Sequence, residues 1–217
     1  MNDLFWSPVQ LSLKIAAVAL VMVFITGTLL AKMMARRKFK GKILVETLFM
    51  LPLVLPPTVI GFLLIIIFGN SSPVGRWIQW FFDQPIMFTW WAAVIASTVV
   101  ALPLMYQSAK TGFSDVDSGV EEAARVDGAG EWIVFFFVTV PLAYRSIISG
   151  AILSFARAFG EFGATLMFAG NIPGKTQTIP TAIYISLESG NMELAWLFVL
   201  TMIIISFLML FAASIFK

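Results

Sequence analysis

The sequence contains neither cysteine nor histidine. Without cysteine, the chain can form no disulfide framework and offers no thiolate as a nucleophile or metal ligand. Without histidine, it lacks the usual general base of enzymes and the commonest metal ligand. Charged residues make up only 12% of the 217, and the net charge of +2 excludes the basic surface that nucleic-acid binding requires. These absences argue against an enzyme, including an intramembrane one, because only scattered carboxylates remain for chemistry.

Apolar residues, by contrast, are abundant. They make up 59% of the chain, and the mean hydropathy is +0.93. A soluble domain of this size would not have enough polar surface to stay dissolved. The composition therefore predicts an all-α integral membrane protein that contacts lipid, with one domain over residues 1–217. Five hydrophobic segments are long enough to cross a hydrocarbon core of about 30 Å: about 9–35, 43–68, 86–109, 142–169 and 193–216.

A basic cluster directly after the first segment predicts the orientation. It consists of Lys32, Arg36, Arg37, Lys38, Lys40 and Lys42. Such clusters stay in the cytoplasm, so we expect the N-terminus outside, a cytoplasmic loop at 110–141 and the C-terminus at Lys217 inside. Residues 69–85, with Trp77 and Trp80, are expected to form an external interfacial helix. Residues 170–191 are expected to be external, partly helical over 178–189, or re-entrant.

Three prolines interrupt the second segment: Pro52, Pro56 and Pro57. Each proline removes an N–H donor and pushes the residue before it out of helical conformation. Broken backbone at membrane depth is tolerated where protein or a water-filled cavity receives the freed carbonyls. The sequence is compatible with a kink that lines or gates a pathway, and equally with a kink that only shapes packing.

The longest polar segment of the chain lies between the third and fourth hydrophobic segments. It and its approach hold six acidic residues: Asp115, Asp117, Glu121, Glu122, Asp127 and Glu131. The pattern Ser118-x-x-Glu121 is a capping box and predicts the start of a short helix. That helix would have a small apolar face made of Val120, Ala123 and Ala124. Gly128 is expected to end it, because glycine adopts left-handed backbone without a Cβ clash. Pro141 suits the first turn of the next helix.

The spacing in this loop resembles the EAA loop of ABC importer permeases. The matching pattern is Glu122-Ala123-Ala124, three residues, Gly128, nine residues, and then Val138-Thr139-Val140-Pro141, with valines where the family has Ile and Leu. The resemblance implies a coupling helix that docks into a groove on a cytoplasmic ATPase, through Glu121, Glu122, Ala123, Ala124, Gly128 and Pro141. The spacing alone would also suit an amphipathic connector lying on the membrane.

Two charges lie well inside the fourth segment. Arg157 and Glu161 are four residues apart and therefore share a helix face. An isolated charge at the centre of a span costs about 2.5–3.5 kcal/mol, so the pair should face protein or water and not lipid. Such a pair can hold helices together or form part of a pore or gate. We favour structure and gating over direct contact with a substrate.

The run 169–176 loosely matches a phosphate-binding P-loop, ending in Gly174-Lys175-Thr176. A genuine P-loop follows a buried strand, opens a helix and has an acidic Mg²⁺ partner on another strand. Here the run follows a predicted transmembrane helix and is expected outside the cell. We therefore reject nucleotide binding at this run.

Longer runs resemble the molybdate permeases of ABC importers and, in part, the related sulfate permeases. They are 51–62, 157–165, 170–176 and 178–180, within a resemblance that covers nearly the whole chain. The resemblance implies that a tetrahedral oxyanion is delivered by an external binding protein. A dianion needs polar backbone, hydroxyls or a cation along its path. The pathway or gate candidates are Pro52, Pro56, Pro57, Arg157, Glu161, Thr165, Asn171, Lys175 and Thr176.

Together these features predict a multi-pass permease subunit of a type I ABC importer in the cytoplasmic membrane, and not an enzyme. Molybdate would cross by alternating access. The implied partners are a cytoplasmic ATPase dimer that binds ATP and Mg²⁺, a second permease copy and an extracytoplasmic oxyanion-binding protein. This chain itself is expected to need no cofactor. The alternatives are a sulfate or tungstate permease of the same fold, and a passive channel or scaffold without ATP coupling.

Overall fold

The computed structural model describes residues 2–215, and within this range the regular elements are all helical. Residues Phe216 and Lys217, where the fifth predicted segment ends, lie outside the described range. In chain order the elements are α1 (Asn2–Ala35), α2 (Lys42–Val54), α3 (Pro57–Phe68), α4 (Pro73–Phe82), α5 (Trp90–Asp115), α6 (Ser118–Val126), α7 (Glu131–Val134), the π-helix η1 (Phe135–Thr139), α8 (Val140–Leu142), α9 (Tyr144–Phe159), α10 (Gly163–Ala169), α11 (Ile179–Glu188) and α12 (Met192–Ile215). The all-α class predicted from the sequence is confirmed.

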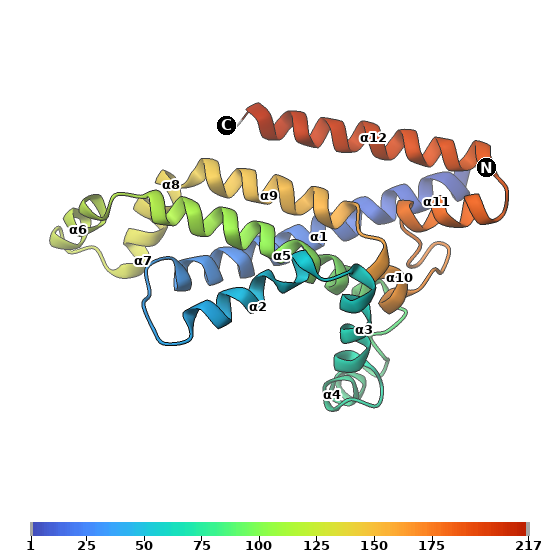
Figure 1. Ribbon diagram of the computed structural model, residues 1–217, viewed down its shortest axis with the longest axis horizontal. Helices are drawn as coiled ribbons and strands as arrows, with labels where there is room; N and C mark the ends of the chain where they lie inside the picture. Colours follow the sequence, from blue (N-terminus) through green and yellow to red (C-terminus); the bar gives the residue numbers. More distant parts are fainter. Residues whose placement is uncertain (1, 216–217) are drawn as a thin grey trace.

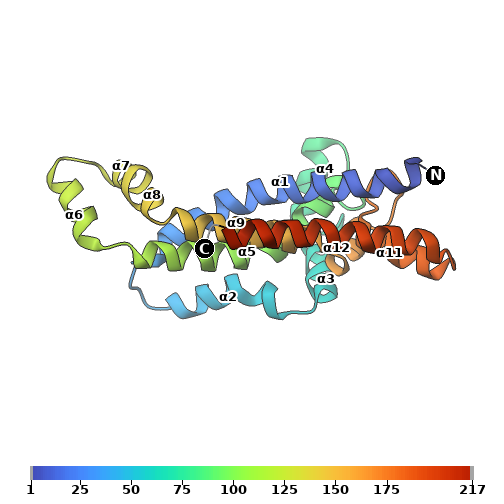
Figure 2. The same ribbon diagram turned by 90° about the horizontal axis from the view of Figure 1, so that it is seen from above.

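The centre of the molecule is a bundle in which α5 packs against both α1 and α9 (Figures 1 and 2). Its largest core has Tyr106, Met105 and Phe113 from α5 in contact with apolar residues of the other two helices. Helices α5 and α9 approach very closely. A Cβ added to Gly112 or Gly150 would lie 2.6 Å from the Cβ of Ser146 or Ser108, respectively. Small residues permit such backbone contact between helices in a membrane.

Three straight helices are long and apolar enough to cross a membrane: α1, α5 and α12. Two further hydrophobic segments are bent. The axes of α2 and α3 differ by 117°, and the segment 131–142 differs from α9 by 76°. Counting each bent pair as one span gives up to five spans. Much of the apolar surface of α12 is exposed, as expected for a helix that meets lipid.

Several predicted boundaries differ from the helix ends: α1 begins at Asn2 and not at 9, and α5 ends at Asp115 and not at 109. The third segment was predicted to begin at 86, but the helix begins at Trp90, where the Thr89 hydroxyl accepts a hydrogen bond from the Ala92 N–H. The fourth was predicted as one helix over 142–169 and is instead divided into α9 and α10 by a break at 160–162. The expected interfacial helix is α4, which exposes Trp77 and Trp80.

Candidate functional site

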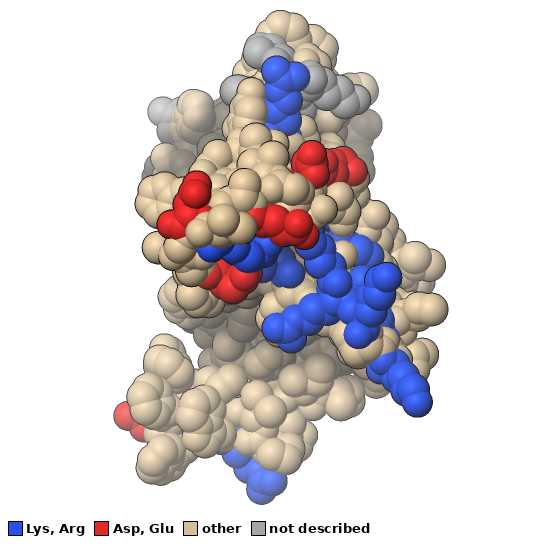
Figure 3. Space-filling model, turned by 90° about the vertical axis from the view of Figure 1, so that its left-hand side faces the viewer, with Lys and Arg blue, Asp and Glu red and all other residues tan. Residues whose placement is uncertain are grey.

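The polar loop between α5 and α9 forms one end of the molecule. In Figures 1 and 2, α6 and α7 lie beyond the ends of the long helices, at the end opposite the N-terminus. Lysine, arginine, aspartate and glutamate side chains gather on this end (Figure 3). The basic residues that follow α1 are exposed. Charges of both signs are therefore gathered on this end of the bundle.

The two ends of α6 are formed by local sequence. At its start, the Asp117 carboxylate accepts a 2.8 Å hydrogen bond from the Gly119 N–H. The predicted capping box was thus wrong, because Asp117, one residue earlier, takes the N-cap position and Ser118 becomes the first helical residue. At its end, Gly128 has φ +90°, as predicted. The N–H groups of Gly128 and Ala129 donate to the carbonyls of Arg125 and Ala124, which completes a Schellman motif.

The two faces of α6 differ from those of an ordinary amphipathic helix. Its one buried residue, among nine that are all described, is Glu121. The apolar residues Val120 and Ala123 are exposed, and Val126 is 87% exposed. Glu122, the first residue of the EAA pattern, is exposed beside them. Helix α6 therefore turns its apolar face away from the bundle.

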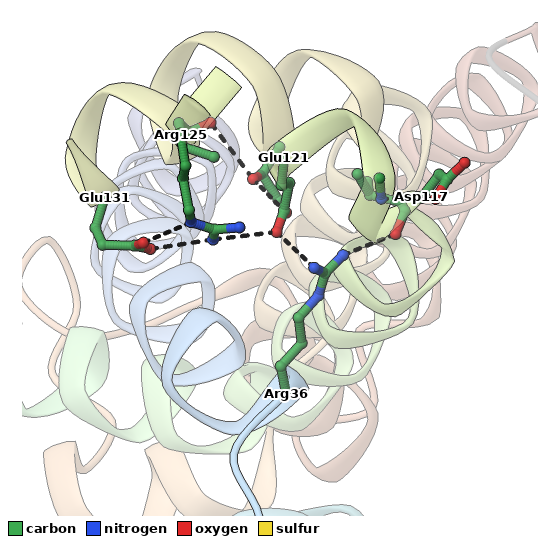
Figure 4. A network of polar contacts seen from close by, with 9 residues as sticks. Arg36, Asp117, Glu121, Arg125 and Glu131 are labelled. Atoms are coloured by element: carbon green, nitrogen blue, oxygen red, sulfur yellow. Dashed lines mark hydrogen bonds and ion pairs between the residues drawn. The ribbon is translucent and has the colours of Figure 1, made fainter. Parts of the chain in front are cut away.

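A network of polar contacts holds Glu121 (Figure 4). One carboxylate oxygen accepts from Arg36 at 2.5 Å, and the other accepts from the Thr139 hydroxyl at 2.7 Å. The second amino group of Arg36 donates to the Val116 carbonyl at 2.7 Å, directly after α5. The buried charge is thereby neutralised and hydrogen-bonded, as an ion in a low-dielectric site requires. This contact was not predicted from the sequence, because Arg36 and Glu121 are 85 residues apart.

A second set of contacts joins α6 to α7. Arg125 donates two hydrogen bonds to the Glu131 carboxylate, at 2.6 and 3.2 Å, and also lies 3.5 Å from Glu121. The bond to Glu131 raises the pKa of Arg125, so this side chain stays charged. The Lys32 ammonium lies 3.6 Å from the ring centroid of Trp132, at the start of α7. Lys32, Glu121, Arg125 and Glu131 line a cavity of about 180 Å³ between α1 and the loop.

Pro141 lies close to the bend that precedes α9. It was predicted to lie in the first turn of a helix, and it is the second residue of the short helix α8. Helical backbone already runs from Glu131 through η1 before it. The Val140 N–H donates to the Phe135 carbonyl, one residue further back than in an α-helix. The exposed ring of Pro141 follows this π-helical turn directly.

The predicted proline kink is real and lies beside the break between α9 and α10. Pro52 is inside α2, whereas Pro56 and Pro57 begin α3 after the bend. A Cβ added to Gly163, the first residue of α10, would lie 2.9 Å from the Cβ of Pro57. Two breaks in helical backbone, about a hundred residues apart in the sequence, therefore meet in the fold.

The predicted pair Arg157–Glu161 spans the second of these breaks. The Arg157 guanidinium donates to the Glu161 carboxylate at 2.7 Å. The other carboxylate oxygen accepts from the Ala164 N–H in the first turn of α10 at 2.8 Å. The Glu161 side chain is 1% exposed and that of Arg157 is 30% exposed. Glu161 therefore fixes the start of α10 while its arginine partner keeps access to solvent.

The remaining candidates follow or belong to α10. The Thr165 hydroxyl is buried with no hydrogen-bond partner among the described residues, and the same holds for the Asn171 side-chain oxygen. The Thr176 hydroxyl is buried; it accepts from the Ile172 N–H and donates to the Gly170 carbonyl. Thr176 therefore closes the loop between α10 and α11. Lys175 is exposed in the same loop. The candidates thus form two groups: the loop around α6, and the region of the two breaks with α10 and the loop after it.

The chain matches known transport proteins along almost its whole length. A family model described as "Binding-protein-dependent transport system inner membrane component" matches residues 12–217. The putative molybdenum transport system permease protein YvgM of Bacillus subtilis (strain 168) is 64% identical over 207 residues, which cover 95% of this chain and 91% of the relative. The molybdenum transport system permease protein ModB of Escherichia coli (strain K12) is 41% identical over 193 residues, covering 89% of this chain and 84% of the relative.

Solved structures share the fold at low sequence identity. A chain of the MetNI methionine ABC transporter, in an inward-facing form, aligns with a TM-score of 0.73 at 16% identity and covers 97% of this chain and 93% of that one. A chain of a bacterial importer of the acidic polysaccharide alginate aligns with a TM-score of 0.77 at 16% identity, covering 100% and 80%. The chain therefore belongs to the binding-protein-dependent transport system inner membrane component family, the permease subunits of ABC importers.

Proposed function

We propose that this chain is the permease subunit of an ATP-driven importer of molybdate. The observation that carries the proposal is the 64% and 41% identity to permeases named for molybdenum transport, over nearly the full length of each chain. The runs that distinguish molybdate permeases in the sequence lie at the two meeting backbone breaks and in the loop after α10. The chain carries the substrate and hydrolyses no nucleotide; ATP and Mg²⁺ belong to a separate ATPase subunit.

We place the α6 end of the molecule in the cytoplasm and count five spans, each bent pair forming one. The exposed basic residues after α1 support this orientation, because positively charged loops remain on the cytoplasmic side. The N-terminus and α4 then lie outside. A reporter fused at Ala129 should be active in the cytoplasm; activity on the outer face would overturn the orientation and the ATPase docking with it.

Helix α6 is the surface on which the ATPase docks. Its exposed face combines Val120, Ala123 and Val126 with the acidic residue Glu122. An apolar centre with a polar rim is the usual composition of a protein interface. Closure of the ATPase dimer would draw together the α6 helices of two permease copies and switch the path between inward and outward access.

The oxyanion path lies along the region where the two breaks meet, between two permease copies. Freed backbone groups, the buried hydroxyl of Thr165 and the partly accessible guanidinium of Arg157 are the polar groups there. Glu161 neutralises Arg157, so a dianion would meet a balanced pair and not a fixed positive charge. Such a site favours passage over tight retention. The extracytoplasmic binding protein supplies the oxyanion at the outer end.

The decisive experiment is uptake of labelled molybdate into proteoliposomes that contain the permease, its ATPase and its binding protein. ATP-dependent uptake, competed by tungstate, is the expected result. Sulfate or tungstate as the main cargo is the second candidate, since related permeases share the fold; titration calorimetry of the binding protein with the three oxyanions separates them. Uptake without ATP, unchanged by substitution of Glu122 or Gly128, would indicate a passive channel and overturn the proposal.

A further inference from the structure

Helix α6 has little apolar packing to fix its direction. It packs mainly against α7 and η1, which belong to the same loop. Its one buried side chain, Glu121, is a carboxylate and not an apolar residue. Because apolar burial contributes so little, the polar contacts of Glu121 and Arg125 must hold α6 in place.

Glu121 and its partner Arg36 together connect α6 to three other parts of the fold. Arg36 directly follows α1, Val116 directly follows α5, and Thr139 is the last residue of η1. The chain itself already links α6 to α5 and, through α7 and η1, to α9. It provides no such link to α1, which is separated from α6 by 80 residues and more. Arg36 therefore supplies an ion pair between the end of α1 and α6.

The geometry of Arg36 suits a rigid connection. One amino group of its guanidinium contacts the carboxylate in α6, and the other contacts the carbonyl at the end of α5. A planar guanidinium fixes two such partners in direction, which the single ammonium of a lysine cannot do. The Glu121 side chain is only 5% exposed, so water reaches its carboxylate poorly. Without Arg36, the desolvation cost of this buried charge would no longer be offset by the ion pair.

We propose that Arg36 and Glu121 are positioning residues that transmit the movement of α6 to α1 during transport. The proposal rests on the proposed docking of the ATPase on α6 and adds the route that the movement takes into the bundle. Helix α1 packs along both α5 and α9. When Arg36 holds α6, these three helices respond to the ATPase together. Without Arg36, α6 can shift while α1 stays where it is.

The test measures transport in proteoliposomes for three variants: Arg36→Gln, Glu121→Gln and the double variant that carries both changes. Each is compared with the control variant Arg37→Gln. Arg37 is the matched control, since it is exposed, carries the same charge and makes no ion pair with any residue in the range 2–215. Molybdate transported per ATP hydrolysed should fall about fivefold or more in both single variants, the size of a typical coupling between sites. ATPase capture should stay normal in Arg36→Gln, because Arg36 lies outside α6 and its exposed face. The double variant should be no worse than either single one, because the two residues act as a unit.

A structural role alone would lower the melting temperature and the yield while transport per ATP stayed at the wild-type ratio, and that result would overturn the proposal. So would additive losses in the double variant, or an equal loss in Arg37→Gln. Arg36→Lys covers the case in which Arg36→Gln does not fold: it keeps the charge but loses the second contact, and it should still lower the ratio.

A separate variant distinguishes failure of this inference from failure of the proposed function. Ala123→Arg places a bulky charge on the exposed face of α6, away from Glu121. If α6 docks the ATPase, this variant loses ATPase capture in mild detergent. Normal capture would reject the docking surface itself. Loss of capture, together with a wild-type transport ratio in Arg36→Gln, would reject only the role of Arg36.

Discussion

Replacement of Gly128 tests whether the backbone at the end of α6 matters for ATPase docking. Gly128 has φ +90°, and an added Cβ would meet nothing within 4 Å. The effect of a side chain there is therefore conformational strain and not a clash. Gly130, in the same loop, offers a matched control: its φ is −70°, and the space around its Cβ position is also empty. The same substitution at either glycine restricts the unfolded chain equally. The difference between their effects on ATPase binding therefore reports the cost of the left-handed conformation at position 128.

Left-handed backbone costs a residue with a Cβ roughly 1–2 kcal/mol. Since 1.4 kcal/mol is tenfold in an equilibrium constant, the Schellman end of α6 would be populated about 5–30 times less in Gly128→Ala. In Gly128→Val this end of α6 should be populated still less, because β-branched residues rarely adopt the left-handed conformation. In Gly128→Asn this end should be populated more than in Gly128→Ala, because asparagine enters the left-handed region more readily. We expect ATPase affinity to fall in the order Gly, Asn, Ala, Val at position 128.

The assay is binding of the purified ATPase to each variant in nanodiscs, with membrane insertion checked by protease protection. Gly130→Val should bind as the wild type does, and all variants should insert normally. Equal losses in Gly128→Val and Gly130→Val would refute the reasoning, since the two positions differ in φ and not in space. Unchanged binding in Gly128→Val would remove α6 from the docking surface.

Substitutions at three further sites test contacts within the fold by thermal unfolding in detergent. Gly150→Val should destabilise the fold by about 1–3 kcal/mol, because its side chain meets Ser108 on α5; an unchanged melting temperature would contradict that close approach. Arg157→Gln should cost about 1–3 kcal/mol, less than a fully buried pair because Arg157 is partly exposed. The double variant with Glu161→Gln should be more stable than Arg157→Gln alone, since no unpaired buried carboxylate is left; the opposite order would show that the pair is not the source of the cost. Thr176→Val should lose about 1–3 kcal/mol by leaving two backbone groups unpaired, and Thr176→Ser should recover most of it; equal loss in both would point to the methyl group instead.

Local chemistry made much of this fold predictable from the sequence. Hydrophobic runs located the helices, because a chain this apolar can satisfy its backbone in a membrane only by helix formation. The end of α6 at Gly128 and the pairing of Arg157 with Glu161 both depend on residues at most a few positions apart. The prediction that the helix cap is Ser118 was wrong for an equally local reason: Asp117, one residue earlier, is as good an N-cap residue.

Features that depend on distant residues were not predictable. Arg36 was assigned only to a basic cluster that decides orientation, and Glu121 only to a capping box and to the ATPase-coupling loop, yet each is the other's partner. Neither periodicity nor spacing reports a pair 85 residues apart. The contact of Pro57 with Gly163 is of the same kind: each break was visible in the sequence, but their meeting is set by the packing of α3 on α10. The π-helical turn before Pro141 likewise gave no signal that distinguished it from α-helix.

The glycine–serine contacts between α5 and α9 have a mechanical consequence. Where a glycine of one helix lies so close to a serine Cβ of the other that no carbon can be added, the two helices cannot slide or roll against each other without separating. Helices α5 and α9 should therefore move together as one rigid unit, with α6 at one end of it. A rigid unit passes a displacement from one end to the other, so the flexing that opens and closes a path is left to the places where helical backbone is bent or broken: α2 with α3, 131–142 with α9, and the break between α9 and α10.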